Sequence, residues 1–273
     1  MTALAQTVDR RFDRATTGLV SSTLTITRRA ALRYVRTPQL IVMATLQMSL
    51  FFLIYRYMFG GAIQAGHLPY VDYLVPGFIA TGVLFSGIGA AVATAEDLEQ
   101  GFVDRLRSLP IPRGSVLAAR ALADTAILAL ASAVTVAIAF AVGFRLHGSV
   151  VQGLAAFGLV IVFGFAFEWV FVTMGLLAGN TQAAQGMGMI VFPFAFISSA
   201  YVPVATMPGW LQVFAKYQPL TFMVDAARSL TLGSTARAEL GHPASYYVIR
   251  AVAWAAGILI VSVPLAVARY RRG

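Results

Sequence analysis

Six apolar runs, each about as long as a membrane-spanning helix, dominate this chain of 273 residues. A helix needs about 20 mainly apolar residues to cross a bilayer. The runs are Leu40 to Phe59, Val71 to Ala95, Val116 to Phe144, Val151 to Ala178, Ala184 to Val204 and Tyr246 to Ala268. Hydrophobic residues make up 59% of the sequence, and a soluble domain of this length has too little interior to hide them. The sequence therefore predicts an all-α polytopic membrane protein, a single six-span transmembrane domain over residues 1–273.

The cationic residues flank these runs unevenly, and such a bias predicts orientation. In a six-span arrangement fourteen arginines share the side of the two termini: Arg10, Arg11, Arg14, Arg28, Arg29, Arg33, Arg36, Arg105, Arg107, Arg113, Arg120, Arg269, Arg271 and Arg272. The other side receives six cations: Arg56, Arg145, Lys216, Arg228, Arg237 and Arg250. We therefore expect a multi-pass protein of the plasma (inner) membrane with both termini cytoplasmic. Residues 1–38 form a cytoplasmic or interfacial N-terminus, residues 39–268 the bundle and residues 269–273 a cytoplasmic tail.

The segment before the first run predicts a helix lying along the inner membrane face. Between Gly18 and Thr37, Arg29, Arg33 and Arg36 recur at helical spacing on one face, largely opposite apolar residues. A basic face with an apolar strip behind it is typical of a monotopic helix. An ordinary positive-inside anchor remains the alternative interpretation.

Several kinds of chemistry lack the residues that they need. Lys216 is the one lysine and no glycine loop precedes it, so the chain has no phosphate-binding loop for ATP. The sequence contains no cysteine, and its three histidines, His67, His147 and His242, have no second ligand at metal spacing. The net charge of +9 lies beside apolar runs, which favours anionic lipid headgroups over nucleic acid as the partner. We expect no metal or cofactor on this chain.

The charged loop between the second and third runs predicts a short amphipathic helix. Leu98, Phe102, Leu106 and Leu109 fall on one helical face. The acidic residues Glu96, Asp97 and Glu99 fall in its first turn, and Arg105 and Arg107 in its last turns, as the helix dipole favours. The prolines Pro110 and Pro112 end it. Its apolar face rests either on a protein partner or on lipid.

The stretch Glu99 to Pro110, EQGFVDRLRSLP, resembles the cytoplasmic signature of ABC-2 type permeases. These are the membrane subunits of type-2 ABC exporters, which include daunorubicin-resistance and nodulation-export permeases. The order of further segments is also similar to that family: Pro76-Gly77-Phe78 in the second run, then Gln218-Pro219-Leu220-Thr221 with Asp225 and Arg228 before the last run. Gln218 replaces the asparagine that is usual in the family.

The resemblance implies that the charged loop is a coupling helix, which docks on a separate ABC ATP-binding subunit. That subunit would hold ATP and Mg, and a second permease subunit, identical or not, would complete the membrane part. The residues that carry the coupling role by this resemblance are Glu96, Asp97, Glu99, Gly101, Phe102, Arg105 and Arg107. The chain itself would be no enzyme but the permease of an exporter that moves a drug, lipid or lipid-linked molecule outward. Alternatives are a polytopic membrane enzyme acting on lipid and a passive channel.

A few polar residues interrupt the apolar runs. Glu168 falls near the middle of the fourth run, where a charge costs about 2.5–3.5 kcal/mol. It is either a substrate-contacting or proton-linked group, or a neutral carboxyl that is hydrogen-bonded between helices. Prolines break the two short helical stretches Leu211–Phe214 and Thr221–Leu232. The family resemblance implies that they form an outer re-entrant hairpin. Asp225 and Arg228 lie there at a spacing that allows them to pair, and are the other pathway candidates. A capping loop without substrate contact is the alternative.

Two further patterns are interpreted as packing features. Arg120 and Asp124 are four residues apart in the third run and are expected to neutralise each other. Small residues recur on one face of the second run: Gly82, Ser86, Ala90 and Thr94. Gly175 and Gly179 have the same spacing in the fourth run. Small stripes allow helices to approach closely, either within the subunit or at a dimer seam.

Overall fold

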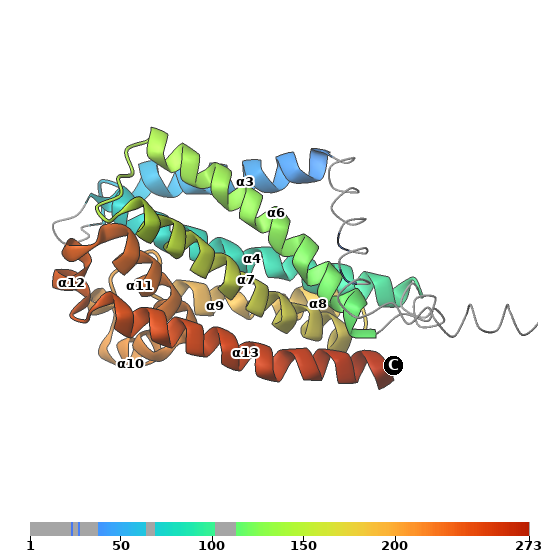
Figure 1. Cartoon of the computed structure of the whole chain (residues 1–273). Helices are drawn as coiled ribbons and strands as arrows, with labels where there is room; N and C mark the ends of the chain where they lie inside the picture. Colours follow the sequence, from blue (N-terminus) through green and yellow to red (C-terminus); the bar gives the residue numbers. More distant parts are fainter. Residues whose placement is uncertain (1–22, 24–26, 28–37, 64–68, 102–112, 273) are drawn as a thin grey trace, which may run out of the picture.

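Five long helices, laid side by side, form the body of the computed structural model (Figure 1). The structure describes residues 23, 27, 38–63, 69–101 and 113–272. The long helices are α3 (Pro38–Phe59), α4 (Tyr70–Glu99), α6 (Arg113–Ala141), α7 (Val150–Ala178) and α13 (Ala244–Arg272). Each contains a stretch long and apolar enough to cross a membrane. Their bounds agree within a few residues with the predicted spans one to four and six, so the all-helical, multi-span prediction is confirmed in this respect.

Helix α4 lies at the centre of the bundle. It packs against α7, α8 and α11, and α7 in turn packs against α13. More than half of the apolar window of α4 is buried, whereas most of that of α3 is exposed. A helix that is apolar on all sides is stable either inside a protein or against lipid. Helix α4 is an example of the first case and α3 of the second. Helix α3 packs mainly on α6 and touches α4 less, which leaves space between them.

The predicted fifth span, Ala184 to Val204, is not one helix. The structure has two short helices instead, α8 (Thr181–Gly188) and α9 (Val191–Phe196), and the chain leaves the helical path in the turns that follow Phe196. Pro193 explains the break, because its nitrogen has no hydrogen to donate to the carbonyl of Met189, one turn earlier. Among the described residues, five helices rather than six are long enough to span by themselves.

The segment from α8 to the turn after α9 nevertheless runs the full length of α4 in the opposite direction. It starts where the Thr181 N–H donates to the Glu99 carboxylate, 3.2 Å away at the end of α4. Phe192 then packs on Phe85 with ring centroids 4.8 Å apart, and the Ser199 carbonyl accepts from the Tyr73 hydroxyl near the start of α4. The distance along α4 between Tyr73 and Glu99 is about 39 Å at 1.5 Å per residue, which exceeds the hydrocarbon thickness of a bilayer.

Three short helices lie at the end of the bundle where α4, α7 and α13 begin (Figure 1). They are α10 (Gly209–Tyr217), α11 (Pro219–Leu232) and α12 (Ser234–Leu240). Pro208 precedes α10 and Pro219 opens α11, positions where the missing N–H of proline costs nothing. The two predicted short stretches are therefore helical. Helix α11 is buried along most of its length against α4, α7 and α13, and we call this the α11 end of the bundle.

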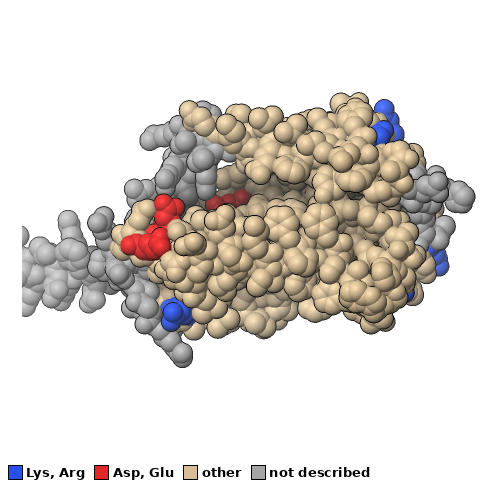
Figure 2. All heavy atoms as spheres, turned by 180° about the vertical axis from the view of Figure 1, so that it is seen from behind, with Lys and Arg blue, Asp and Glu red and all other residues tan. Residues whose placement is uncertain are grey.

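The opposite end carries the end of α13, and we call it the C-terminal end. There α4 and α7 finish and α3 and α6 start (Figure 1). Figure 2 shows that on one face the charged side chains of the described residues gather near the two ends, apart from acidic atoms inside a hollow between them. The predicted interfacial helix between Gly18 and Thr37 lies outside the described residues, apart from Thr23 and Thr27.

Candidate functional site

A cavity of about 690 Å³ lies between α3, α4 and α6 and is closed on one side by α9. It opens on the face of the bundle in Figure 2, where acidic atoms are visible inside the hollow. The space exists because α4 carries small residues on the side that faces α3 and α6: Gly82, Ser86, Gly89, Ala90 and Ala93 all line the cavity. A Cβ added at Gly89 would meet no atom within 4 Å.

Three members of the predicted small-residue stripe, Gly82, Ser86 and Ala90, therefore border a cavity. The fourth member, Thr94, lies instead at the close approach of α4 and α7, where it faces Gly175 of the predicted α7 pair. Gly87 faces the ring of Phe171, and Gly175 on α7 faces the backbone of Ala91. Both contacts are so tight that an added Cβ would collide.

Aromatic side chains form the wall of the cavity toward the α11 end. Tyr55 of α3 stacks on Tyr201, which follows α9, with ring centroids 4.8 Å apart. The Tyr201 hydroxyl is 2.8 Å from the Thr81 hydroxyl of α4. Phe78 and Phe85 of α4 extend the aromatic lining.

Charged side chains line the other half of the cavity. They are Arg120 and Asp124 on α6 and Glu168 on α7. Arg120 forms an ion pair with Asp97 of α4 and lies 3.7 Å from Asp124, measured from Nε to Oδ2. The predicted pairing of Arg120 with Asp124 is confirmed, but these residues also border the cavity, which the sequence did not indicate.

Glu168 is the most deeply placed of these charged groups. Its side chain is buried, with 3% of the residue exposed, and Oε2 has no hydrogen-bond partner within the described part of the chain. It lies ten residues before the end of α7 at Ala178, about 15 Å along the helix. Asp124 lies a similar distance into α6 from the same end of the bundle. A carboxyl group therefore faces the cavity at a depth where hydrocarbon surrounds the bundle.

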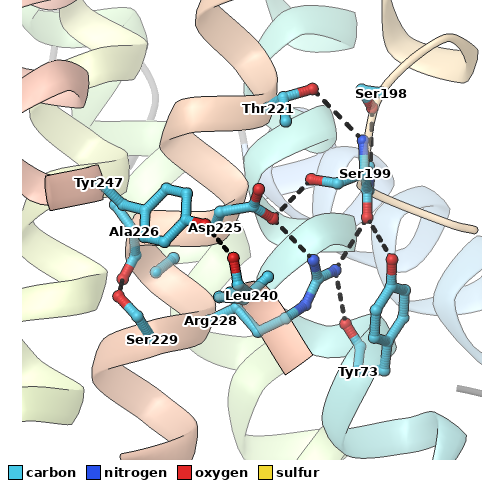
Figure 3. A network of polar contacts seen from close by, with 12 residues as sticks. Tyr73, Ser198, Ser199, Thr221, Asp225, Ala226, Arg228, Ser229, Leu240 and Tyr247 are labelled. Atoms are coloured by element: carbon cyan, nitrogen blue, oxygen red, sulfur yellow. Dashed lines mark hydrogen bonds and ion pairs between the residues drawn. The ribbon is translucent and has the colours of Figure 1, made fainter. Parts of the chain in front are cut away.

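The other pathway candidates, Asp225 and Arg228, form a buried network at the α11 end (Figure 3). The Arg228 guanidinium donates to Asp225 at 3.0 Å and to the backbone carbonyls of Tyr73 and Ser199 at 3.1 and 2.9 Å. It also stacks on the Tyr73 ring at 3.7 Å. The Ser199 hydroxyl donates to the Asp225 carboxylate at 2.7 Å. The expected pairing of Asp225 with Arg228 is thus present.

This network joins three separate parts of the chain: α11, the start of α4 and the turn after α9 (Figure 3). Neither Asp225 nor Arg228 lines the cavity. Gln218 adds a further link, since its side-chain amide donates to the Ile197 carbonyl. These contacts hold α11 and the turn after α9 against the start of α4.

The acidic residues of the predicted coupling helix lie elsewhere than expected. Glu96, Asp97 and Glu99 occupy the last turn of α4, not the first turn of a new helix, because no residue after Ala95 interrupts α4. Anions are unfavourable at a helix C-terminus, and two of these three are compensated. Asp97 pairs with Arg120, and Glu99 accepts the Thr181 N–H.

The remaining coupling candidates are only partly described. Gly101 follows α4 with a φ of 64°, a left-handed conformation that glycine adopts at helix ends without strain. Phe102, Arg105 and Arg107 lie outside the described residues. The coupling role of all seven candidates stays a prediction.

Long apolar helices around a cavity open to one face of the bundle define a multi-pass membrane permease. The chain belongs to the ABC-2 type transporter family, which residues 21–232 match. It is 30% identical over 253 residues to the daunorubicin resistance ABC transporter permease protein DrrB1 of Streptomyces coeruleorubidus, covering 92% of this chain and 87% of the relative. The resemblance found in the sequence motifs is therefore confirmed.

Two further relatives have related names. The chain is 27% identical over 256 residues to the probable doxorubicin resistance ABC transporter permease protein DrrC of Mycobacterium tuberculosis, covering 93% of this chain and 89% of the relative. It is 28% identical over 165 residues to the putative transport permease ycf38 of Pyropia yezoensis, covering 56% of this chain and 55% of the relative. The two drug-resistance permeases are thus matched over most of their length, and the ycf38 protein over about half.

Sequence reasoning missed the aromatic half of the site. Tyr55, Phe78 and Tyr201 come from three segments up to about 146 positions apart, and single aromatic residues are common in every apolar run. The one usable signal was the number of small residues on one face of α4, which indicates space as well as close packing.

Proposed function

We propose that this chain is the membrane subunit of an ATP-driven exporter, and that its substrate occupies the cavity between α3, α4 and α6. The cavity itself is the observation that supports this. Its volume of about 690 Å³ lies in the range of pockets that hold drug-sized ligands. It opens on the apolar face of the bundle, where a hydrophobic or amphipathic molecule arrives from the membrane (Figure 2).

The route of the chain supports a six-crossing topology. Helix α7 ends at the C-terminal end of the bundle and α13 starts at the α11 end (Figure 1). The chain must return between them, and α8 with α9 follows α4 over this distance. We infer that this broken segment is the fifth crossing, that both termini are cytoplasmic and that α11 is re-entrant on the outer side.

The position of α4 suggests how ATP would act on the cavity. Small residues of α4 line the cavity, and the same helix leads directly into the stretch Glu99 to Pro110 that resembles the coupling signature. A shift of this stretch on an ATP-binding subunit would move α4 as a rigid rod against α3 and α6. A second permease subunit, the same or different, would complete the transporter.

A cavity-filling substitution tests this proposal. Gly89→Leu places a side chain in the cavity without a collision at Cβ. We expect it to reduce ATP-dependent daunorubicin export at least about tenfold, the effect of losing about 1.4 kcal/mol of binding. The measurement is uptake into inverted membrane vesicles that contain the chain and its ATP-binding subunit.

Gly158→Leu is the matched control. Gly158 is an exposed glycine in α7 with open space at its Cβ, and it does not line the cavity. This variant should export at the wild-type rate. Equal export by wild type and both variants, at equal amounts of folded protein, would remove the cavity from the transport path.

A further inference from the structure

Among the described residues, acidic side chains outnumber basic ones around the cavity. Arg120 is the one cation among the lining residues, and it faces the carboxylates of Asp97 and Asp124. Glu168 adds a third carboxyl group nearby, within electrostatic range of both Arg120 and Asp124. Within the described part of the chain, this half of the site therefore holds three acidic groups against one basic group.

Within the described part of the chain, Glu168 is the acidic group at this site that has no ion pair, because Arg120 pairs with Asp97 and Asp124. Its Oε2 lacks a hydrogen-bond partner in the described structure, and the residue is 3% exposed. Burying an unpaired carboxylate costs free energy. A cationic group that enters the cavity recovers part of this cost by pairing with Glu168.

The rest of the cavity fits the remainder of such a ligand. Its opposite half presents the aromatic rings of Tyr55, Phe78, Phe85 and Tyr201. Aromatic faces bind apolar ring systems and attract cations through their quadrupole. A ligand with an aromatic body and one positive charge would place the body on these rings and the charge toward α7.

We propose that the cavity selects lipophilic organic cations, with Glu168 as the counter-charge that distinguishes them from neutral and anionic molecules of the same shape. This inference rests on the proposed function, because it assigns a substrate class to the same cavity. Asp97 and Asp124 also contribute negative charge, but both form ion pairs with Arg120. Selectivity therefore depends mainly on Glu168.

Two probes of equal shape and opposite charge test the proposal. Tetraphenylphosphonium and tetraphenylborate both carry four phenyl rings, one as a cation and the other as an anion. We expect the full chain in nanodiscs to bind tetraphenylphosphonium at least about tenfold more tightly, the effect of one charge-assisted contact. Binding is measured by equilibrium dialysis, with empty nanodiscs subtracted for each probe.

Substitutions of Glu168 test whether this residue causes the preference for the cationic probe. Glu168→Gln keeps the size of the side chain and removes its charge, so tetraphenylphosphonium should bind about tenfold more weakly while tetraphenylborate binds at least as well as before. Glu168→Asp keeps the charge and should keep the preference for the cation. Unchanged tetraphenylphosphonium binding by a folded Glu168→Gln protein would overturn the proposal.

The wild-type protein alone provides a test that does not depend on the folding of any variant. Equal affinity for the two probes would overturn the charge selection directly. Gly89→Leu separates this failure from a failure of the proposed function. If Gly89→Leu weakens both probes, the cavity is a binding site, whatever its charge preference. If it weakens neither, the cavity is not the binding site and both proposals are wrong.

Discussion

Arg228 makes three hydrogen bonds and one cation–π contact in the buried interior of the bundle. It is 1% exposed, pairs with Asp225 and donates to the carbonyls of Tyr73 and Ser199. The planar guanidinium can serve these acceptors together because its donors point in fixed directions. A lysine would keep the charge but reach fewer of them.

We therefore expect Arg228→Lys to lower the free energy of unfolding by about 2–4 kcal/mol, because at least one buried carbonyl loses its donor. The measurement is unfolding of the purified chain in detergent, followed by circular dichroism. Arg250→Lys is the control, since Arg250 is exposed and contacts the Tyr246 ring, and its effect should stay within about 0.5 kcal/mol. An equal effect of the two variants would contradict the structural role of Arg228.

At the scale of elements, the packing of the turn after α9 on α4 depends on one glycine. A Cβ at Gly77 would overlap the carbonyl of Ala200, whereas a Cβ at Gly89 on the same helix meets no atom within 4 Å. Gly77 follows Pro76, which removes one helical hydrogen bond and weakens α4 locally. The tertiary contact compensates for this local weakness.

The same substitution at both glycines should give effects of opposite sign. Gly77→Ala is expected to lower the free energy of unfolding by about 1–3 kcal/mol, because the backbone of the turn must shift. Gly89→Ala is expected to raise it by up to about 1 kcal/mol, because alanine favours the helix. Both values come from detergent unfolding curves of the purified protein. A stabilising Gly77→Ala would contradict the close packing of the turn on α4.

At the scale of the whole molecule, the topology decides which end of the cavity faces the cell interior. The chain has no cysteine, so single cysteines report their position without background. Ser234 opens α12 at the α11 end, and Gln100 follows α4 at the C-terminal end; both are exposed.

We expect a membrane-impermeant maleimide to label Ser234→Cys in intact cells and to label Gln100→Cys only after the cells are permeabilised. The reason is the excess of arginines on the side of the termini, which sets orientation. Labelling is read by the mass shift of the purified chain, with the cysteine-free wild type as control. The reverse pattern would invert the topology, and labelling of both sites in intact cells would rule out the six-crossing route.

The sequence by itself determined the class of the protein and the positions of its long helices. The helices α3, α4, α6, α7 and α13 follow from runs of apolar residues, because a backbone in hydrocarbon must satisfy its hydrogen bonds within one helix. Prolines also marked the starts of α10 and α11. These features depend on neighbours in the chain, and a sequence shows neighbours directly.

Only the tertiary structure decided which of these residues meet. Arg228 binds the Tyr73 carbonyl across 155 positions, and Asp97 of α4 pairs with Arg120 of α6 rather than starting a helix of its own. The cavity, the isolation of Glu168 and the broken course of α8 and α9 depend on how the helices are rotated and spaced against one another. In an apolar bundle that arrangement results from side-chain packing, which no periodicity within a single run records.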